Sequence, residues 1–286
     1  MRQTRFIRNK KPPVTLSSST FGSWKILLYN TEAVVVKTVR YGETHAIVTL
    51  LTPIGRVSAM ARSAMKPQSR LAAGIRLCAE GTYSIYQGKG MGTISQVEVV
   101  ASRRRLHEDL ESAAYAAYFC ELILHSAPER PDGDPAMYRQ FTALLDALVD
   151  RPSDSEVLAR VWETKMSRWL GVSPEWTTCI RCNEPLTPAV RYHTREGGLI
   201  CGKCTLFTDI SLSFPVPESM GKILYLFERT SIDKLGHIQI SVATRRALKQ
   251  TLYYQLSDFA GLYLKSRHIL DQLAETFGTD NGGDPI

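Results

Sequence analysis

Four of the six cysteines form two C-x-x-C pairs, Cys179 with Cys182 and Cys201 with Cys204. The 18 residues between the pairs match the spacing that is typical of zinc sites. Four thiolates complete a tetrahedral shell around one ion. Two disulfides or loose thiols are the alternative, but paired motifs in a reducing compartment favour metal. Because such a shell has no open position for water, the pattern predicts one structural Zn²⁺ and no catalytic metal.

The positive charges are concentrated at the front of the chain. Residues 1–105 hold 17 lysines and arginines against 4 acids, a net charge of +13, whereas the remaining 181 residues carry −6. This asymmetry predicts a polyanion as the partner of the first part, with a solvated basic face as the alternative. The candidate DNA-binding residues lie on or between the expected strands, and they are Lys37, Arg40, Arg56, Arg62, Lys66, Arg70, Arg76, Arg103 and Arg104.

Aromatic side chains are sparse in this basic segment. Tyr41, Tyr83 and Tyr86 can stack on bases, as aromatic residues of single-strand-binding barrels do, or they can fill the core. With so few aromatics, we expect attraction to phosphates to dominate binding and sequence preference to be weak.

The sequence contains no recognisable catalytic motif. It has no G-x-x-x-x-G-K-[ST] phosphate loop, no G-x-S-x-G nucleophile elbow and no H-x-E signature of zinc deaminases. The six histidines have no ligand or triad spacing. We therefore predict a binding protein without catalytic residues. A metal-assisted nucleic-acid-modifying enzyme and an RNA-binding zinc-ribbon protein are the alternatives.

The apolar pattern predicts an α+β chain with two folded parts. Residues 28–105 form a run of five short strands with glycine-rich turns, which favours an OB-fold β-barrel. Residues 106–277 have helical periodicity, and an inserted four-cysteine zinc ribbon at 177–206 interrupts it. We expect residues 1–27 to be a disordered basic arm or extension and residues 278–286 to be a flexible tail.

Individual elements follow from the same patterns. The expected strands span 32–39, 44–51, 55–62, 74–86 and 93–100, and the expected helices span 107–125, 137–149, 155–170, 218–228 and 242–264. The two unpaired cysteines, Cys78 and Cys120, lie in apolar surroundings and are expected in the core.

No apolar run approaches the roughly 18 residues of a membrane span, and no apolar segment follows the basic N-terminus as in a secretory signal. We therefore expect no membrane association and a cytoplasmic, nucleoid-associated protein.

Several short segments, taken in order, resemble the RecO family of bacterial recombination mediators in its zinc-containing form. The resemblance covers about residues 28–275. No single segment is unique to the family, but this many in this order are specific. The segments are TEAVVVK from Thr31, YGET from Tyr41, TPIGR from Thr52, KPQSR from Lys66, QVE from Gln96, AYAAYFCEL from Ala114, LGVSP from Leu170 and REGGLIC from Arg195.

The resemblance implies an OB-fold, a helical domain and an inserted zinc ribbon. It also implies binding to single- and double-stranded DNA, annealing of complementary strands, and a complex with RecR. It further implies contact with the acidic C-terminal tail of single-strand-binding protein, so that RecA can be loaded at gaps. Among the basic residues, Lys37, Arg40, Arg56, Lys66 and Arg70 fall in or beside the matched segments. The chain departs from the family in the extension before Leu28, because the family usually begins its first strand almost at once.

Overall fold

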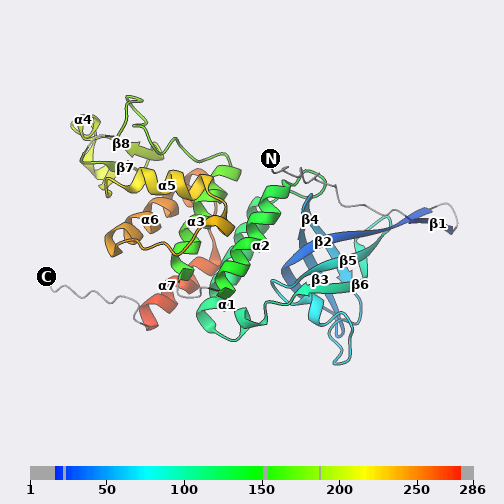
Figure 1. The fold of residues 1–286 in the computed structure, drawn as a ribbon. Coiled ribbons are helices and arrows are strands. Elements are labelled where there is room, and N and C mark those ends of the chain that lie inside the picture. The colour runs from blue at the N-terminus through cyan, green and yellow to red at the C-terminus, as the bar shows by residue number, and fades with distance from the viewer. Residues whose placement is uncertain (1–16, 22–23, 151–153, 187, 278–286) are drawn as a thin grey trace, which may run out of the picture. The chain divides into compact units, whose positions relative to one another are not determined.

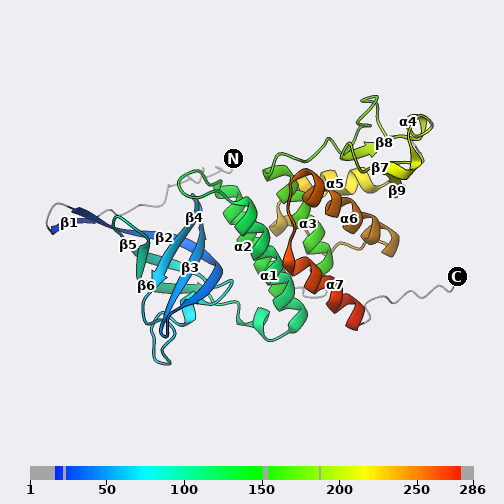
Figure 2. The same cartoon turned by 180° about the vertical axis from the view of Figure 1, so that it is seen from behind.

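The computed structural model of the chain describes residues 17–21, 24–150, 154–186 and 188–277. The chain divides into two compact units. Among the described residues, the barrel unit holds those up to Thr52 together with Val57–Ser102, and the helical unit holds Pro53–Arg56 and those from Arg103 onward. Figure 1 and Figure 2 show the strands of the first unit and the helices of the second.

The barrel unit is a sheet that closes on itself. Its strand order is β1-β2-β3-β4-β6-β5, and an additional pairing of β2 with β5 completes a ring of five strands, to which β1 is attached through β2. This arrangement confirms the predicted α+β class with an OB-like barrel at the N-terminal end. The strands are β1 (Ser17–Phe21), β2 (Trp24–Tyr41), β3 (His45–Thr52), β4 (Gly55–Ala61), β5 (Glu80–Gln87) and β6 (Gly92–Ala101).

A one-residue bulge in β2 decides which of its side chains face the barrel core. Val35 belongs to the core and is paired with Leu50 of β3. The register then shifts between Val35 and Lys37. Because alternate residues of a strand face opposite sides, the extra residue turns Lys37, Val39 and Tyr41 outward. Without the bulge, the same three residues would continue the inward-facing set.

The start of the barrel unit differs from the expected disordered arm. Residues 17–21 form β1, and β2 begins at Trp24 rather than near residue 32. The first half of β2 pairs with β5, from Leu27 opposite Gln87 to Val34 opposite Glu80. Since this partner lies about 50 residues away along the chain, the local sequence pattern does not reveal the pairing. The rest of the expected arm and the expected tail at 278–286 lie outside the described residues.

The helical unit is built around α3, which contacts α1, α2, α5 and α6. Most residues of α3 are buried, and Trp162 at its centre packs against Phe141 of α2 with 5.7 Å between ring centroids. Both unpaired cysteines, Cys78 of the barrel unit and Cys120 of α1, are buried as predicted. The longer helices are α1 (Leu110–Ser126), α2 (Pro135–Asp150), α3 (Ser155–Trp169), α5 (Met220–Arg229), α6 (Val242–Tyr254) and α7 (Lys265–Phe277).

Helix α7 was not predicted, because the sequence pattern suggested one helix over 242–264. In the structure α6 ends at Tyr254, passes into a π-helical turn, and Gly261 with a φ of +67° redirects the chain. None of the side chains described for α7 is fully buried. The helix is held by polar contacts instead. Glu121 of α1 accepts hydrogen bonds from the backbone amides of Ser266 (2.8 Å) and Lys265 (3.2 Å) at its first turn.

Lys165 is a buried cation of α3 that supports the end of α5. Its Nζ donates to the carbonyls of Thr230 (2.6 Å) and Glu228 (3.2 Å), where the helical ladder leaves carbonyls without partners. Burial lowers the pKa of Lys165 to about 8.

This depressed pKa predicts a pH dependence of stability. Between about pH 8 and pH 10 the unfolded chain still carries a proton that folded Lys165 has lost, so stability should rise with pH across that window. We expect the rise to be on the order of 2 kcal/mol and to be missing in Lys165→Met. Urea denaturation followed by tryptophan fluorescence at pH 7.5, 8.5 and 9.5 measures it. If the free energy of unfolding changed with pH in the same way in the wild-type protein and in Lys165→Met, the lowered pKa of Lys165 would be contradicted.

Candidate metal centre and nucleic-acid interface

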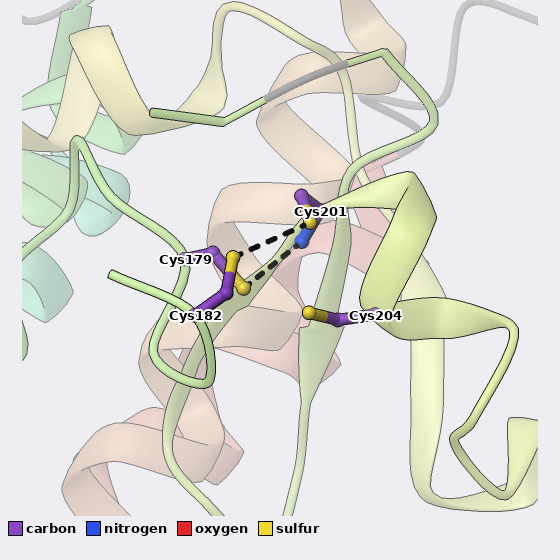
Figure 3. Close-up of side chains that lie close together, drawn as sticks. All are labelled: Cys179, Cys182, Cys201 and Cys204. Carbon is purple, nitrogen blue, oxygen red and sulfur yellow. Dashed lines mark hydrogen bonds between the residues drawn. The ribbon is translucent and has the colours of Figure 1, made fainter. Parts of the chain in front are cut away.

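The four paired cysteines converge on one point (Figure 3). Their sulfur atoms all lie within 4.8 Å of one another, and the sulfurs of Cys182 and Cys201 are 3.9 Å apart. In a tetrahedral site with bonds of about 2.3 Å, neighbouring sulfurs are about 3.8 Å apart. The donor set therefore fits a single tetrahedral metal ion.

Two short segments position the sulfurs. The first is a tight turn in which Asn183, with a φ of +58°, donates its amide to the carbonyl of Cys179 (2.9 Å). The second begins after strand β8 (Gly198–Ile200), where Cys201 precedes the short helix α4 (Gly202–Thr205) that carries Cys204. The amide of Cys201 donates to the sulfur of Cys179 (3.4 Å) and links the two segments. This bond supports a thiolate at that position.

The thiols influence one another's ionisation. Burial opposes ionisation of Cys201, but the amide of Cys204 and the neighbouring sulfurs outweigh it and lower the pKa of that thiol to about 7. Partial burial and the other sulfurs raise the pKa of Cys204 to about 12. The opposite directions follow from crowding of like charges, since the first thiolates to form oppose the ionisation of the last. A cation at the centre removes that opposition, and metal binding releases protons.

The cysteine-bearing segment packs against the helices through strand β7 (Arg191–His193), which pairs with β8 and with β9 (Ser213–Pro215). Tyr192 of β7 is fully buried, and its hydroxyl donates to Oε1 of Gln255 (2.9 Å). The ring of Tyr192 lies 5.3 Å from that of Phe214 and 6.3 Å from that of Tyr254. Loss of order at the metal site would therefore reach the π-turn after α6.

His193, the histidine closest in sequence to the second cysteine pair, is not part of the metal-binding group. Its Nδ1 accepts the amide of Glu196 (3.1 Å), and the carboxylate of Glu196 is held by Nε of Arg181 (3.1 Å to each oxygen). Arg181 also donates to the hydroxyl of Thr208 (2.7 Å), which in turn donates to the carbonyl of Cys204 (2.8 Å). These polar contacts connect the two cysteine segments outside the sulfur shell.

Six of the predicted DNA-binding cations are exposed on the barrel unit. Between residues 33 and 79 the sequence contains a single acid, Glu43, so these cations meet little opposing charge. We call this set the basic surface, and its members are Lys37, Arg40, Arg62, Lys66, Arg70 and Arg76.

The segment between β4 and β5 brings cations distant in sequence towards the end of β2. The amide of Ser63 donates to Nδ1 of His45 (2.9 Å), and the amide of Met65 donates to the carbonyl of Thr44 (2.9 Å). Arg62 and Lys66, which flank these residues, therefore lie beside the turn that joins β2 to β3. Further along the segment, the hydroxyl of Thr38 donates to the carbonyl of Ile75 (2.5 Å), which places Arg76 next to β2.

Three predicted contacts do not belong to the basic surface. Arg103 is buried, its side chain is 3% exposed, and it forms an ion pair with Asp146 at 2.7 Å. Arg56, the second residue of β4, is grouped with the helical unit and donates from Nε to the carbonyl of Ala127 (2.6 Å). Arg104 is exposed but is paired with Glu108 at 3.0 Å. Sequence position alone does not reveal which of three consecutive arginines turns inward.

The three candidate stacking residues separate clearly. Tyr83 is a core residue whose hydroxyl donates to the carbonyl of Gly74 (2.7 Å), and burial raises its pKa above the usual range. Tyr41 and Tyr86 are 55% and 46% exposed. The two residues are far apart along β2. Tyr41 is the last residue of β2, whereas Tyr86 of β5 is paired with Leu28 near the start of β2.

None of the described helices has both the length and the apolar character that crossing a membrane requires.

Comparison with known proteins gives a consistent result. The family model described as Recombination protein O N terminal matches residues 26–103, and the model described as Recombination protein O C terminal matches residues 107–268. A protein of Bacillus cereus strain AH187 named DNA repair protein RecO is 35% identical over 243 residues, which cover 85% of this chain and 96% of that protein. Proteins with the same name from Bacillus anthracis and Bacillus mycoides strain KBAB4 match with the same identity and coverage.

Proposed function

This chain belongs to the RecO family of recombinational repair proteins, and on that premise we propose that it is a DNA-binding recombination mediator. In this proposal it anneals complementary single strands and helps RecR to load RecA on gapped DNA. The basic surface carries the proposal, because six exposed cations with one acid among them suit the phosphate backbone of either single- or double-stranded DNA.

We propose that the metal is one Zn²⁺ ion with a structural role. Thiolate ligands in tetrahedral geometry select zinc or iron–sulfur chemistry, and two C-x-x-C turns around a single point favour zinc. Four protein ligands fill the shell. Within the described residues, the four cysteines are also the one group of three or more potential ligands close enough to share an ion. We propose that the protein has no catalytic activity of its own, and cleavage of labelled DNA in the presence of Mg²⁺ or Zn²⁺ would favour an enzyme instead.

The proposed partners follow from the family. We expect RecR to bind this protein directly and RecA to be loaded with its help but without direct contact. We expect single-strand-binding protein to be contacted through its acidic C-terminal tail. A protein with these partners would act in the cytoplasm, at the nucleoid. Competition between RNA and single-stranded DNA for the basic surface separates this proposal from that of an RNA-binding zinc-ribbon protein.

Annealing provides the functional test. Without ATP, the protein should accelerate annealing of complementary oligonucleotides coated with single-strand-binding protein, and removal of that protein's tail should reduce the effect. Arg62→Glu with Lys66→Glu should abolish the acceleration, because annealing requires both strands to be held through their phosphates. Lys222→Glu is the matched control, since it changes an exposed lysine of α5 outside the basic surface. Equal loss of annealing in the control and in the double variant would contradict the proposed role of the barrel.

A further inference from the structure

The outward faces of β2 and β3 form one continuous surface. In the antiparallel register, Lys37 lies opposite Thr49, Val39 opposite Ile47, and Tyr41 opposite His45. Residues directly opposite in such a pair share a face of the sheet. The alternate residues of β3 belong to the core, so these three pairs point outward. We call them the outer-face platform, and its members are Lys37, Val39, Tyr41, His45, Ile47 and Thr49.

The platform mixes apolar and aromatic groups with the basic surface. Tyr41 and Val39 share the outward face with Lys37, and they are 55% and 45% exposed. Met65, whose amide donates to the carbonyl of Thr44 in the turn between β2 and β3, is 39% exposed. Attraction to phosphates alone does not require exposed apolar side chains next to cations. Exposed aromatic and apolar side chains do suit the faces of unpaired bases, because every base offers a π-surface to an aromatic ring.

Hydrogen bonds fix the end of the platform at which Tyr41 lies. The guanidinium of Arg40 donates to the carbonyls of Glu43 (2.9 Å) and Gly42 (3.2 Å) across the turn, and Gly42 adopts a φ of +62°. His45 is held from the other side by the amide of Ser63. The backbone of such a turn loses little freedom when a base stacks on Tyr41, which favours binding.

Paired and unpaired DNA present different groups to such a surface. In a duplex the base faces are stacked inside the helix, so a protein meets phosphates and groove edges. An unpaired strand also presents base faces. Cations of the basic surface can engage both forms, whereas Tyr41 can stack only on the second.

We propose that the outer-face platform binds unpaired bases and that stacking on Tyr41 makes the protein prefer single-stranded over double-stranded DNA. The proposal rests on the proposed DNA-binding function and names the form of DNA that the same surface selects. Lys37, on the same face four residues earlier, binds a phosphate of the stacked strand.

The test compares three variants by fluorescence anisotropy with an oligo-dT strand and with a duplex of equal length, over a series of salt concentrations. Tyr41→Ala should weaken binding of the single strand by about 5- to 150-fold and leave its salt dependence unchanged, because stacking releases no counterions. Its duplex affinity should stay within about twofold of wild type. Tyr41→Phe should keep most of the affinity. Lys37→Ala should instead flatten the salt dependence of both DNA forms.

Tyr86→Ala is the control, because this similarly exposed tyrosine is paired with Leu28, thirteen residues before Tyr41 on β2. It should bind both DNA forms as wild type does. If Tyr41→Ala binds the single strand as wild type, or if it weakens single strand and duplex equally, the stacking proposal is wrong while the proposed function stands. If the wild-type protein binds neither DNA form at low salt, the proposed function itself fails. Unchanged thermal melting of Tyr41→Ala excludes misfolding as the cause of its loss.

Discussion

Cys201→Ser is expected to release the metal and to abolish cooperative unfolding of the helical unit. The free energy of binding a structural zinc ion is on the order of 10 kcal/mol or more, which equals the whole stability of a typical domain. The segment between the cysteine pairs packs through Tyr192 on Gln255 and on the ring of Tyr254, so its disorder should spread to α6 and its π-turn. The barrel unit should remain folded, because its core consists of its own residues.

Two further variants separate loss of metal from damage to packing. Cys182 is exposed, so Cys182→Ser removes a ligand without opening a cavity, and it should destabilise the protein about as much as Cys201→Ser. Cys120→Ala removes a buried cysteine of α1 that is no ligand, and it should keep a full equivalent of zinc at a cost of roughly 1–2 kcal/mol. Elemental analysis and differential scanning calorimetry measure both quantities. A Cys182→Ser protein with full zinc content and wild-type melting would refute the assigned site.

Reversing two charges of the basic surface, Arg62→Glu with Lys66→Glu, should weaken binding of single-stranded DNA by about a hundredfold at low salt. Both residues are exposed and flank the segment that Ser63 and Met65 attach to the β2–β3 turn. Each lost phosphate contact should also flatten the logarithmic dependence of affinity on salt by about one unit or slightly less.

Arg103→Met is the matched comparison for the charge reversal. This arginine was among the predicted DNA contacts, but it is buried against Asp146. Its replacement should lower the stability of the helical unit and leave the salt dependence of DNA binding unchanged. If Arg103→Met flattens the salt dependence while the double variant does not, the basic surface has been assigned to the wrong residues.

The metal-binding group was predictable because its signal is local. Two C-x-x-C turns can be recognised from spacing alone, and the convergence of Cys179, Cys182, Cys201 and Cys204 in the structure agrees with that expectation. The barrel strands were also largely predictable, because short runs of β-branched residues alternate with glycine-rich turns.

Features that depend on distant partners were not predictable in the same way. The pairing of β2 with β5 extends β2 back to Leu27, and no local sequence signal indicates this distant partner. The bulge after Val35 reverses the inward and outward faces, so a simple alternation places Lys37, Val39 and Tyr41 in the core. Arg103 turns towards Asp146, which lies 43 residues away. The first turn of helix α7 is capped by Glu121 of α1, which lies 144 residues earlier in the chain.

The salt dependence of DNA binding by the wild-type protein is the most direct measurement. If about six cations contact phosphates, the logarithmic slope for a single strand should be close to −4, and affinity should fall several-hundredfold between about 50 and 200 mM salt. Binding that is absent at low salt, or that hardly changes over this range, would contradict a basic barrel whose function is to hold DNA.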